Sequence, residues 1–507
     1  MGLLIMYGKR EFGDYQTPLD FADKVCFYLR DYCHVSPSAV IEPTCGIGNF
    51  LISSMVFNAK EYYGIEINPE YCEICKKNVD TNKVKIINSD FFSFQTRDLI
   101  LDKRQILIIG NPPWVTNSML SSLNSDNLPI KRNFKGISGI DALTGTSNFD
   151  ICEYIILQLI NEHKNTNTVI CMLCKTSVAR NIFHELMREQ LNFSKCYILN
   201  FNASSIFGIN ASACVLLVHL SDGKICSNVC NVYNLDNPSV IQAQYRYLNG
   251  KITKILQHDY NNYDGKCCFE WRQGVKHDCS KIMELVKDND VYVNGKNDTV
   301  NIEDDIVYPL IKSSMFKYPI IHNFSKFVIV TQKKVREQTE YIKHQMPKTW
   351  KYLNDNIEFF QKRKSSIYKG APCFSMFGVG EYSYSVYKVG ISGFYKQPLF
   401  SVLYSDNKKP VMTDDTSYFI CFDNYDMAYV AMLLLNSQKV RHFLMTISFT
   451  DAKRPYTKKV LERLDFNKII DSLTLNELYE TERELKLNNV ITEIMYQSFK
   501  SIIRNKN

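Results

Sequence analysis

The sequence lacks several features that would restrict where the protein works. No apolar run comes near the roughly 20 residues that a membrane-spanning helix needs, so we expect no membrane association. The first ten residues, MGLLIMYGKR, lack the long apolar stretch and the small-residue cleavage site of a secretory signal peptide. Tandem repeats and low-complexity tracts are also missing. A chain of this kind with 17 cysteines is typical of a reducing compartment, and we expect a cytoplasmic protein.

A complete set of metal ligands is absent from the sequence as well. Two CxxC pairs occur, Cys72/Cys75 in a helical pattern and Cys171/Cys174 in an apolar, strand-like run. Neither has a second pair or a histidine cluster nearby to complete four ligands. We therefore expect cysteines that pack as small apolar residues, and no metal site.

Charge is unevenly distributed along the chain. With 507 residues and a hydrophobic fraction of 45%, the chain is long enough for two or three domains. Residues 1–250 hold 22 basic and 23 acidic residues, whereas residues 251–507 hold 38 basic and 30 acidic ones. This difference predicts that a polyanion contacts mainly the second half.

The first half alternates between strand-like and helical patterns. The strand-like runs are residues 38–43, 62–67, 83–89, 105–110, 168–174, 195–201 and 213–220. Helical patterns lie between most of them, at residues 21–32, 49–57, 69–79, 149–160 and 178–191. The alternation predicts an α/β domain with a doubly wound, seven-stranded and mostly parallel sheet. Only NASSIFGINAS joins the last two runs, so we expect them to form an antiparallel hairpin at the sheet edge.

The composition and the hydrophobic pattern of the sequence change after the alternation of strands and helices stops near residue 221. Short aromatic runs, turns and charged stretches follow, and two helical patterns come last. We expect an α/β domain over residues 1–225, a linker or edge extension over 226–265, and a separate α+β domain that ends in helices over 266–507.

Glycines follow the first strand, in IEPTCGIGNFL (residues 41–51). Gly46 and Gly48 predict a tight turn into a helix, which lets a ligand approach the backbone at the carboxyl end of the strand. The third glycine of a dinucleotide-binding fingerprint is replaced by Leu51, and the lysine of a phosphate-binding P-loop is absent. The turn thus predicts a ligand site that is neither of these two.

Acidic residues stand at the ends of the next two strands. Glu66 ends the second strand, and Asp90 ends the third and is followed by Phe91. A carboxylate at the first position can accept hydrogen bonds from both hydroxyls of a ribose. A carboxylate beside an aromatic ring can hold the amino group and the face of an adenine. Together with Glu42 after the first strand, these acids predict a nucleoside-binding edge of the sheet.

The fourth strand ends in an unusual turn, Gly110-Asn111-Pro112-Pro113-Trp114. The side-chain oxygen of Asn111 and the carbonyl of Pro112 can both accept hydrogen bonds from a planar NH2 group. The prolines restrict the backbone, so that the two acceptors converge and direct the nitrogen lone pair at an electrophile. Trp114 can stack on a base and present its π face to a cation such as a sulfonium.

In this order, the motifs resemble those of a known enzyme family. They are similar to the gamma-class (NPPY/W-type) S-adenosylmethionine-dependent DNA adenine-N6 methyltransferases of restriction–modification systems. The matching stretches are DYQTP (14–18), IEPTCGIGNF (41–50), GIEINP (64–69), SDFF (89–92), GNPPW (110–114), SNFD (147–150) and SIFG (205–208). The resemblance covers about residues 11–220, whereas the second half matches the family's target-recognition domains only loosely.

The resemblance implies a fold, a cofactor and a set of residue roles. The fold is a Rossmann-like methyltransferase domain followed by a C-terminal α+β target-recognition domain, and the cofactor is S-adenosylmethionine. The residues that it implies for the cofactor are Tyr15, Thr17, Glu42, Cys45, Gly46, Gly48, Glu66, Ile67, Asp90, Phe91 and Asn111. Those implied for the target adenine are Asn111, Pro112, Pro113 and Trp114, with Phe207 packing on the other side of the base. About 35 residues separate NPPW from SNFD, an interval that departs from the family pattern.

Double-stranded DNA is the implied substrate, and basic stretches in the second half are candidates to bind it. The candidate side chains are Lys333, Lys334, Lys362, Arg363, Lys364, Lys453 and Arg454. The alternative that they form a solvated basic face stays open. A single recognition domain suits a monomer on an asymmetric site, and a separate restriction endonuclease is a possible partner.

Two alternative activities share the same chemistry. An N4-cytosine DNA methyltransferase also modifies a planar ring amine. A protein glutamine methyltransferase also uses an NPP-aromatic motif, although such enzymes are usually much shorter and lack a basic second half.

Overall fold

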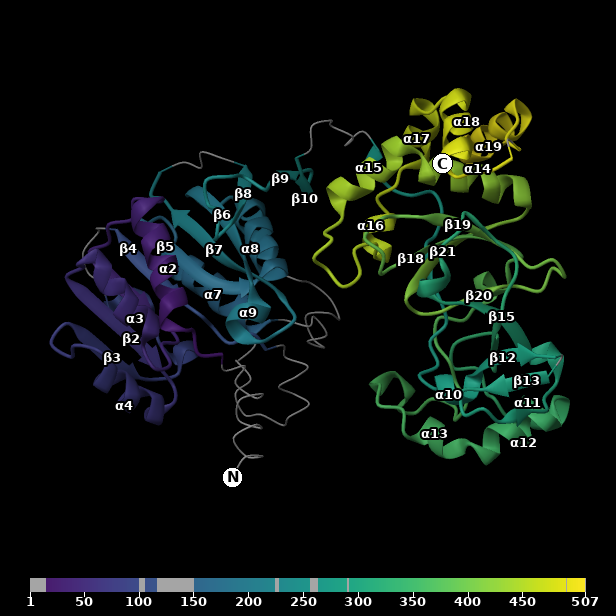
Figure 1. Ribbon diagram of the computed structural model, residues 1–507, viewed down its shortest axis with the longest axis horizontal. Coiled ribbons are helices and arrows are strands. Elements are labelled where there is room, and N and C mark those ends of the chain that lie inside the picture. The colour runs from purple at the N-terminus through teal and green to yellow at the C-terminus, as the bar shows by residue number, and fades with distance from the viewer. Residues whose placement is uncertain are drawn as a thin grey trace. The chain divides into compact units, whose positions relative to one another are not determined.

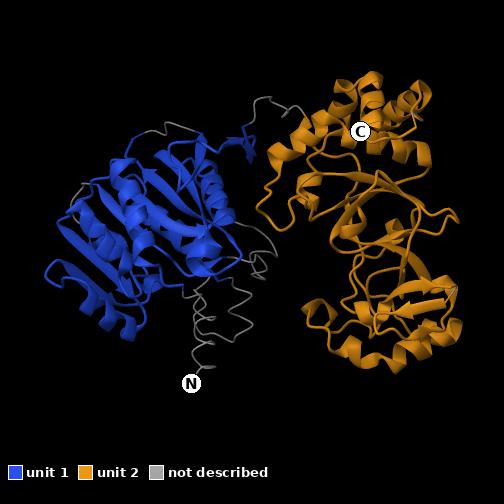
Figure 2. Ribbon diagram, viewed as in Figure 1, with its two compact units in different colours: residues 1–255 blue, residues 256–507 orange. Residues whose placement is uncertain are grey.

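The protein consists of two compact units, residues 1–255 and 256–507 (Figure 2). The computed structural model describes residues 15–99, 105–115, 150–223, 228–255, 263–289, 291–488 and 490–506. Among these residues, no helix combines the length and the apolar character needed to cross a membrane. The interval between NPPW and SNFD lies outside the described residues.

Unit 1 is built on a ten-stranded sheet in the order β10-β9-β8-β6-β7-β5-β4-β1-β2-β3 (Figure 1). The strands are β1 (Ala39–Glu42), β2 (Glu61–Glu66), β3 (Val84–Asn88), β4 (Ile106–Gly110), β5 (Thr168–Lys175), β6 (Phe193–Asn202), β7 (Ser212–Leu220), β8 (Val229–Asn234), β9 (Ala243–Leu248) and β10 (Lys251–Lys254). Strands β3, β2, β1, β4 and β5 run parallel, and the strand order reverses between β1 and β4. In open α/β sheets, such a reversal opens a crevice at the carboxyl ends of the strands.

Helices alternate with most strands of unit 1, as the sequence pattern predicted. They are α2 (Leu19–Asp31), α3 (Asn49–Ser54), α4 (Pro69–Asn78), α7 (Ile151–His163), α8 (Thr176–Arg188) and the single turn α9 (Ala203–Phe207). Strands β1, β4 and nearly all of β5 are buried along their whole length, because helices cover the sheet. Side-chain caps begin three of the helices: Asn68 accepts from two backbone N–H groups of α4, Asn202 from two of α9, and Asp150 from one of α7. The expected α/β, Rossmann-like fold is confirmed.

The edge of this sheet differs from the prediction. We expected seven strands with the β6–β7 hairpin at the edge, but β8 pairs in parallel with β6, and β9 and β10 continue the sheet beyond it. The connection NASSIFGINAS also contains the helical turn α9. The sequence signal for β8–β10 is weak because these strands are half-exposed and mix polar with apolar residues.

Unit 2 contains two sheets and a group of helices. The five-stranded sheet has the order β11-β21-β18-β19-β16, and the six-stranded sheet has the order β14-β13-β12-β17-β15-β20. Its strands are β11 (Arg272–Gln273), β12 (Glu284–Asp288), β13 (Val291–Asn294), β14 (Thr299–Val300), β15 (Val307–Ile311), β16 (Ile320–Ile321), β17 (Lys326–Ile329), β18 (Tyr387–Ser392), β19 (Phe400–Leu403), β20 (Met412–Thr413) and β21 (Ser417–Phe422). Its helices are α10 (Ser280–Met283), α11 (Tyr341–Gln345), α12 (Pro347–Asp355), α13 (Ile357–Gln361), α14 (Tyr425–Asn436), α15 (Gln438–Ile447), α16 (Lys458–Leu461), α17 (Phe466–Ser472), α18 (Leu475–Glu484) and α19 (Glu493–Asn505). Helix α14 is buried on nearly all sides, so it forms the centre of the core that joins the helices to the five-stranded sheet.

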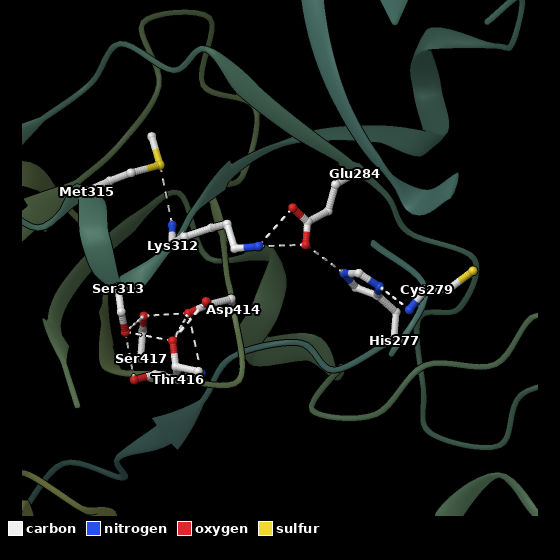
Figure 3. A network of polar contacts seen from close by, with 9 residues as sticks. All are labelled: His277, Cys279, Glu284, Lys312, Ser313, Met315, Asp414, Thr416 and Ser417. Atoms are coloured by element: carbon white, nitrogen blue, oxygen red, sulfur yellow. Dashed lines mark hydrogen bonds and ion pairs between the residues drawn. The ribbon is translucent and has the colours of Figure 1, made fainter. Parts of the chain in front are cut away.

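Polar side chains link the two sheets of unit 2 (Figure 3). The Nζ of Lys312, just after β15, contacts both carboxylate oxygens of Glu284 at 2.9 Å. The hydroxyl of the next residue, Ser313, lies 2.6 Å from that of Thr416, and Asp414 accepts from the Thr416 hydroxyl at 2.7 Å. Because Lys312 and Ser313 are consecutive, one short segment holds β12 of the six-stranded sheet and the start of β21 of the five-stranded sheet.

A buried histidine makes the stability of unit 1 sensitive to pH. Burial lowers the pKa of His163, at the end of α7, to about 4, and the positive charge of Arg97 acts in the same direction. The ordinary value is 6.5, so the unfolded chain binds the proton first as the pH falls. The free energy of unfolding should therefore decrease between pH 6.5 and 4, by at most about 3 kcal/mol from this group. Urea denaturation followed by circular dichroism should show a shallower pH dependence for His163→Gln than for the wild type.

The matched control is His344→Gln, which removes an exposed histidine in α11. It should keep the wild-type pH dependence. The same dependence in His163→Gln and in the wild type would contradict the assignment.

Candidate active site

The predicted site residues of the first half gather at the carboxyl edge of the parallel strands. Glu42 ends β1, Glu66 ends β2, and Asn111 directly follows β4. Strand β1 pairs with β2 on one side and with β4 on the other, so these three strand ends are neighbours. The chain thus places two carboxylates and a side-chain amide around the crevice where the strand order reverses.

The glycine turn after β1 depends on left-handed backbone. Gly46 has φ 51° and Gly48 has φ 89°, values that favour glycine. There is also no room for a side chain, since a Cβ on Gly46 would lie 2.6 Å from Oε1 of Gln16, and one on Gly48 would lie 2.5 Å from Sγ of Cys75. The turn therefore requires glycine at both positions.

The Glu66 carboxylate ties this turn to the one that follows β2. Its Oε2 accepts from the backbone N–H of Gly46 at 2.9 Å, and its Oε1 accepts from that of Asn68 at 2.8 Å. Glu66 is buried, with 8% of its surface exposed. A carboxylate has about four acceptor positions, so hydroxyl groups of a ligand can share it with these two N–H groups.

Glu42 is buried at the end of β1 and accepts from the backbone N–H of Leu51 at 3.2 Å. Burial raises the pKa of its carboxyl well above the usual range, and the neighbouring acidic groups of Cys75 and Glu66 act in the same direction. Gly110 in β4 would place a Cβ 3.5 Å from Cγ of Glu42, so this carboxyl lies between the glycine turn and the turn after β4. The raised pKa favours the protonated form, which can donate a hydrogen bond as well as accept one.

A strap of three residues, Tyr15 to Thr17, contacts the glycine turn after β1 and the turn after β4. The side-chain amide of Asn49 donates to the carbonyl of Thr17 at 2.7 Å, and the backbone N–H of Ile47 donates to Oε1 of Gln16 at 3.3 Å. Gln16 and Asn49 were missed as site residues because their role depends on this close approach. Both stand inside recognised motifs, DYQTP and IGNF, and this position in the sequence was the only available signal.

The strap also orients the amide of Asn111. Its Nδ2 donates to the carbonyl of Tyr15 at 2.8 Å. A carbonyl can only accept, so the nitrogen end of the amide is fixed toward the strap and the oxygen end points away. That oxygen, Oδ1, is buried and has no hydrogen-bond partner within the described residues. A buried acceptor without a partner is costly in a folded protein, and here it lies on the residue predicted to grip an amine.

Aromatic rings line the same edge. Trp114 is buried, and its indole N–H donates to the carbonyl of Leu173 at 3.3 Å. The rings of Trp114 and Phe207 contact each other edge to face, with centroids 5.7 Å apart and an interplanar angle of 71°. Tyr15 lies 6.2 Å from both rings. A base therefore has no open slot between Trp114 and Phe207, and stacking between them requires the rings to separate.

The residues predicted for the adenine of the cofactor lie after β2 and β3. Ile67 is 46% exposed and Asp90 is exposed, whereas the ring of Phe91 is buried. The Asp90 carboxylate accepts from the backbone N–H of Phe92 at 3.0 Å, which orients it as the cap of a short helical turn. The Phe91 ring packs against Phe92, with centroids 5.6 Å apart.

Cysteines near the site are buried. Cys45 directly precedes Gly46, and a hydrogen bond between Cys45 and Cys75 raises the pKa of the first thiol and lowers that of the second. Cys72 is buried in α4, and Cys171 and Cys174 are buried in β5. No group of three or more His, Cys, Asp or Glu side chains suited to a metal ion occurs in the part of the chain that the structure describes.

The candidate DNA-binding residues of unit 2 fall into two groups. The lysines are exposed, namely Lys333, Lys334, Lys362, Lys364 and Lys453. Arg363 instead donates to the carbonyls of Ser375 and Cys373, both at 2.7 Å, and its guanidinium lies 3.7 Å from the centroid of the Tyr368 ring. These contacts hold Arg363 against its own loop, and its phosphate contact stays a prediction.

Arg454 also contacts other parts of the protein. It is half-buried, donates to the carbonyl of Asp415 at 3.1 Å and lies over the ring of Phe394. A basic run in a sequence does not distinguish an arginine that binds backbone carbonyls from a lysine in solvent, because both patterns are equally charged.

Comparison with known proteins was made on sequence and on structure. Residues 3–301 match the family model described as N-6 DNA Methylase. The Type II methyltransferase M.NspV of Nostoc sp. is 38% identical over 468 residues, which cover 90% of this chain and 96% of that protein. The Type II methyltransferase M.CvrRI of Paramecium bursaria Chlorella virus XZ-6E is 28% identical over 173 residues, or 34% of this chain and 38% of that protein.

Among solved structures, the fold is similar to that of the Type IIL restriction-modification enzyme MmeI in complex with DNA. The TM-score is 0.54 at 12% identity, and the match covers 96% of this chain and 76% of that one. At this identity the likeness concerns the fold alone. The family match spans more than half of the chain, and the relative from Nostoc is similar over nearly its whole length. The chain therefore belongs to the N-6 DNA methylase family and is a DNA methyltransferase that modifies adenine at N6.

Proposed function

We propose that the protein is the modification enzyme of a restriction–modification system. It transfers a methyl group from S-adenosylmethionine to the N6 amine of an adenine flipped out of double-stranded DNA. The observation that carries this proposal is the buried oxygen of Asn111, which lacks a partner in the described residues while its amide nitrogen is held by Tyr15. The similarity to Type II methyltransferases supports the restriction–modification context.

The residues at the crevice suit S-adenosylmethionine, which supplies a methyl group on a positively charged sulfur. Gly46 and Gly48 let the turn after β1 adopt the left-handed backbone that places it at the carboxyl edge of the sheet, where it can contact the cofactor's amino-acid part. Glu66 is placed to accept hydrogen bonds from the ribose hydroxyls, in addition to the two N–H groups that orient it. Ile67 and Asp90 are exposed beyond the ends of β2 and β3, where they can meet the adenine of the cofactor.

The turn after β4 can grip the target amine. An adenine NH2 group donates two hydrogen bonds, and Asn111 Oδ1 and the Pro112 carbonyl accept them. Their pull shifts the nitrogen from planar toward tetrahedral, which frees its lone pair for the methyl group. The methyl group would bond to N6 as its bond to sulfur breaks, which leaves a neutral thioether, and the amine would then lose one proton to solvent. No strong base is needed, so the rate depends mainly on position and on preorganised dipoles.

Base flipping brings the adenine to this turn and costs a few kcal/mol. Stacking on Trp114 offsets part of this cost. Trp114 is fixed by the Leu173 carbonyl, whereas Phe207 ends the single turn α9 and is followed by Gly208 with φ 67°. Phe207 is therefore the ring that moves to admit the base.

Unit 2 would bind the duplex through its exposed lysines, and a monomer suits a chain with one such unit. A separate restriction endonuclease would share its recognition sequence, and the cytoplasm would be the place of action.

Within unit 2, Arg363 would stabilise the loop that carries Lys362 and Lys364.

The first test uses methyl-labelled S-adenosylmethionine and unmethylated duplex DNA, with nucleosides identified after digestion. The wild type should produce labelled N6-methyldeoxyadenosine. Asn111→Ala should lower the rate of methyl transfer about 10²–10³-fold, because one acceptor of the amine is lost from the transition state.

Asn192→Ala is the matched control, since it removes an exposed amide that donates to Asn165. Its rate should equal that of the wild type. An undiminished rate in Asn111→Ala would overturn the proposed role. Label in cytosine would move the specificity to N4, and label in protein would support glutamine as the substrate.

Cofactor binding should depend on Glu66. In Glu66→Gln, one of the two oxygens becomes an NH2 group, which cannot accept from Gly46 or Asn68 or from a ribose hydroxyl. The affinity for S-adenosylmethionine, measured by isothermal titration calorimetry, should fall about 10- to 100-fold. Glu61→Gln, at the exposed first residue of β2, should bind normally. Unchanged affinity in a folded Glu66→Gln protein would rule out the ribose contact.

DNA binding should weaken steeply with salt. Each phosphate contact contributes about −0.9 to the slope of log K against log [salt]. Lys364→Ala should reduce the slope by about one, and Lys77→Ala, an exposed lysine of α4, should not change it. Fluorescence anisotropy on a labelled duplex measures both. An affinity that is indifferent to salt would contradict the assignment of unit 2 to phosphate binding.

A further inference from the structure

An ion pair lies directly behind the Asn111–Trp114 turn. Lys175, the last residue of β5, places its Nζ 2.6 Å from Oδ2 of Asp150, the cap of α7. The same Nζ lies 3.5 Å from the carbonyl oxygen of Trp114. The side chains are 31% and 9% exposed, so the pair is partly shielded from solvent. Neither residue belongs to the set predicted for catalysis or for cofactor binding.

The carboxylate of Asp150 serves two neighbours. Its Oδ1 accepts from the backbone N–H of Cys152, the second residue of α7, while Oδ2 accepts from Lys175. The next residue, Ile151, donates its N–H to the carbonyl of Val115 at 2.9 Å. The start of α7, the end of β5 and the residues after NPPW therefore meet at one point.

The chemistry of the turn explains why such an anchor is needed. Pro112 and Pro113 have no backbone N–H, so two consecutive residues cannot donate a hydrogen bond to the surrounding fold. The turn must be held through its acceptors and side chains. Trp114 supplies a side-chain donor and a backbone acceptor. Its indole N–H donates to the Leu173 carbonyl, and its own carbonyl faces the Lys175 ammonium. The two partners of Trp114, Leu173 and Lys175, therefore both lie within the last three residues of β5.

We propose that Lys175 is a positioning residue for methyl transfer. By bridging Asp150 and the Trp114 carbonyl, it fixes the backbone of the turn so that Asn111 Oδ1 and the Pro112 carbonyl converge on the amine. Lys175 does not touch the adenine or the cofactor, and its effect is transmitted through Trp114. This inference rests on the proposed role of Asn111 and Pro112 as the grip on the amine.

The test separates the rate of the chemical step from binding. Lys175→Met keeps most of the side-chain volume and removes the charge. It should lower the single-turnover rate of adenine methylation about 10- to 100-fold, which is the effect of a small misplacement of reacting groups. The KM for DNA and the affinity for S-adenosylmethionine should stay at their wild-type values. Lys175→Arg, which retains the charge and the donors, should restore most of the rate.

Asp150→Asn probes the other side of the ion pair. Asparagine caps helices as well as aspartate does, so the start of α7 is retained while the charge is lost. This variant should lose rate as Lys175→Met does, and the double variant should be no slower than either single one, because the three proteins lack the same interaction.

Arg188→Met is the matched control. Its ion pair with Glu185 in α8 has nearly the same exposure, 34% and 11%, and lies away from the turn. Its rate should equal that of the wild type. The proposal would be overturned if Lys175→Met lost no more rate than Arg188→Met, or if it raised the KM for DNA with its rate unchanged, which would indicate a direct DNA contact. A wild-type protein that does not methylate adenine would instead refute the proposed function itself.

Discussion

The hydrogen bond from the Asn111 amide to the Tyr15 carbonyl determines how the crevice of unit 1 can work. An amide group can turn over and exchange its nitrogen and oxygen ends unless something distinguishes them. A backbone carbonyl distinguishes them because it can only accept. The contact therefore directs an acceptor, rather than a donor, at the place proposed for the target amine. It also couples the strap to the turn after β4, so that the segment that contacts the glycine turn is the one that orients Asn111.

The site is held by interactions that each serve two elements. Glu66 joins the turns after β1 and β2, Asp150 joins the start of α7 to the end of β5, and Trp114 is fixed at both its ring and its carbonyl. Side chains contact two elements at once for a physical reason. Glycine and proline at the carboxyl edge leave the turns with few side chains and few backbone donors of their own. The remaining polar groups must therefore orient more than one neighbour.

Much of unit 1 could be predicted from the sequence, because long apolar strands alternate with amphipathic helices and the chemistry is concentrated at the strand ends. The ten-stranded sheet could not be predicted, since the half-exposed β8–β10 carry little apolar signal. Residues such as Gln16, Asn49 and Lys175 were also missed. Each contacts a segment that is distant in the sequence, and no local sequence pattern indicates that two such segments lie close together in the fold. The contacts of Arg363 with backbone carbonyls were not predicted either, because an arginine in a basic run gives no sign of them in the sequence.

The hydrogen bond between Val115 and Ile151 has a consequence for how this fold can vary. It fixes two points of the chain beside each other, one directly after the turn that follows β4 and the other at the first residue of α7. The number of residues between 115 and 151 can therefore vary while these two points, and with them the proposed grip on the amine, stay in place.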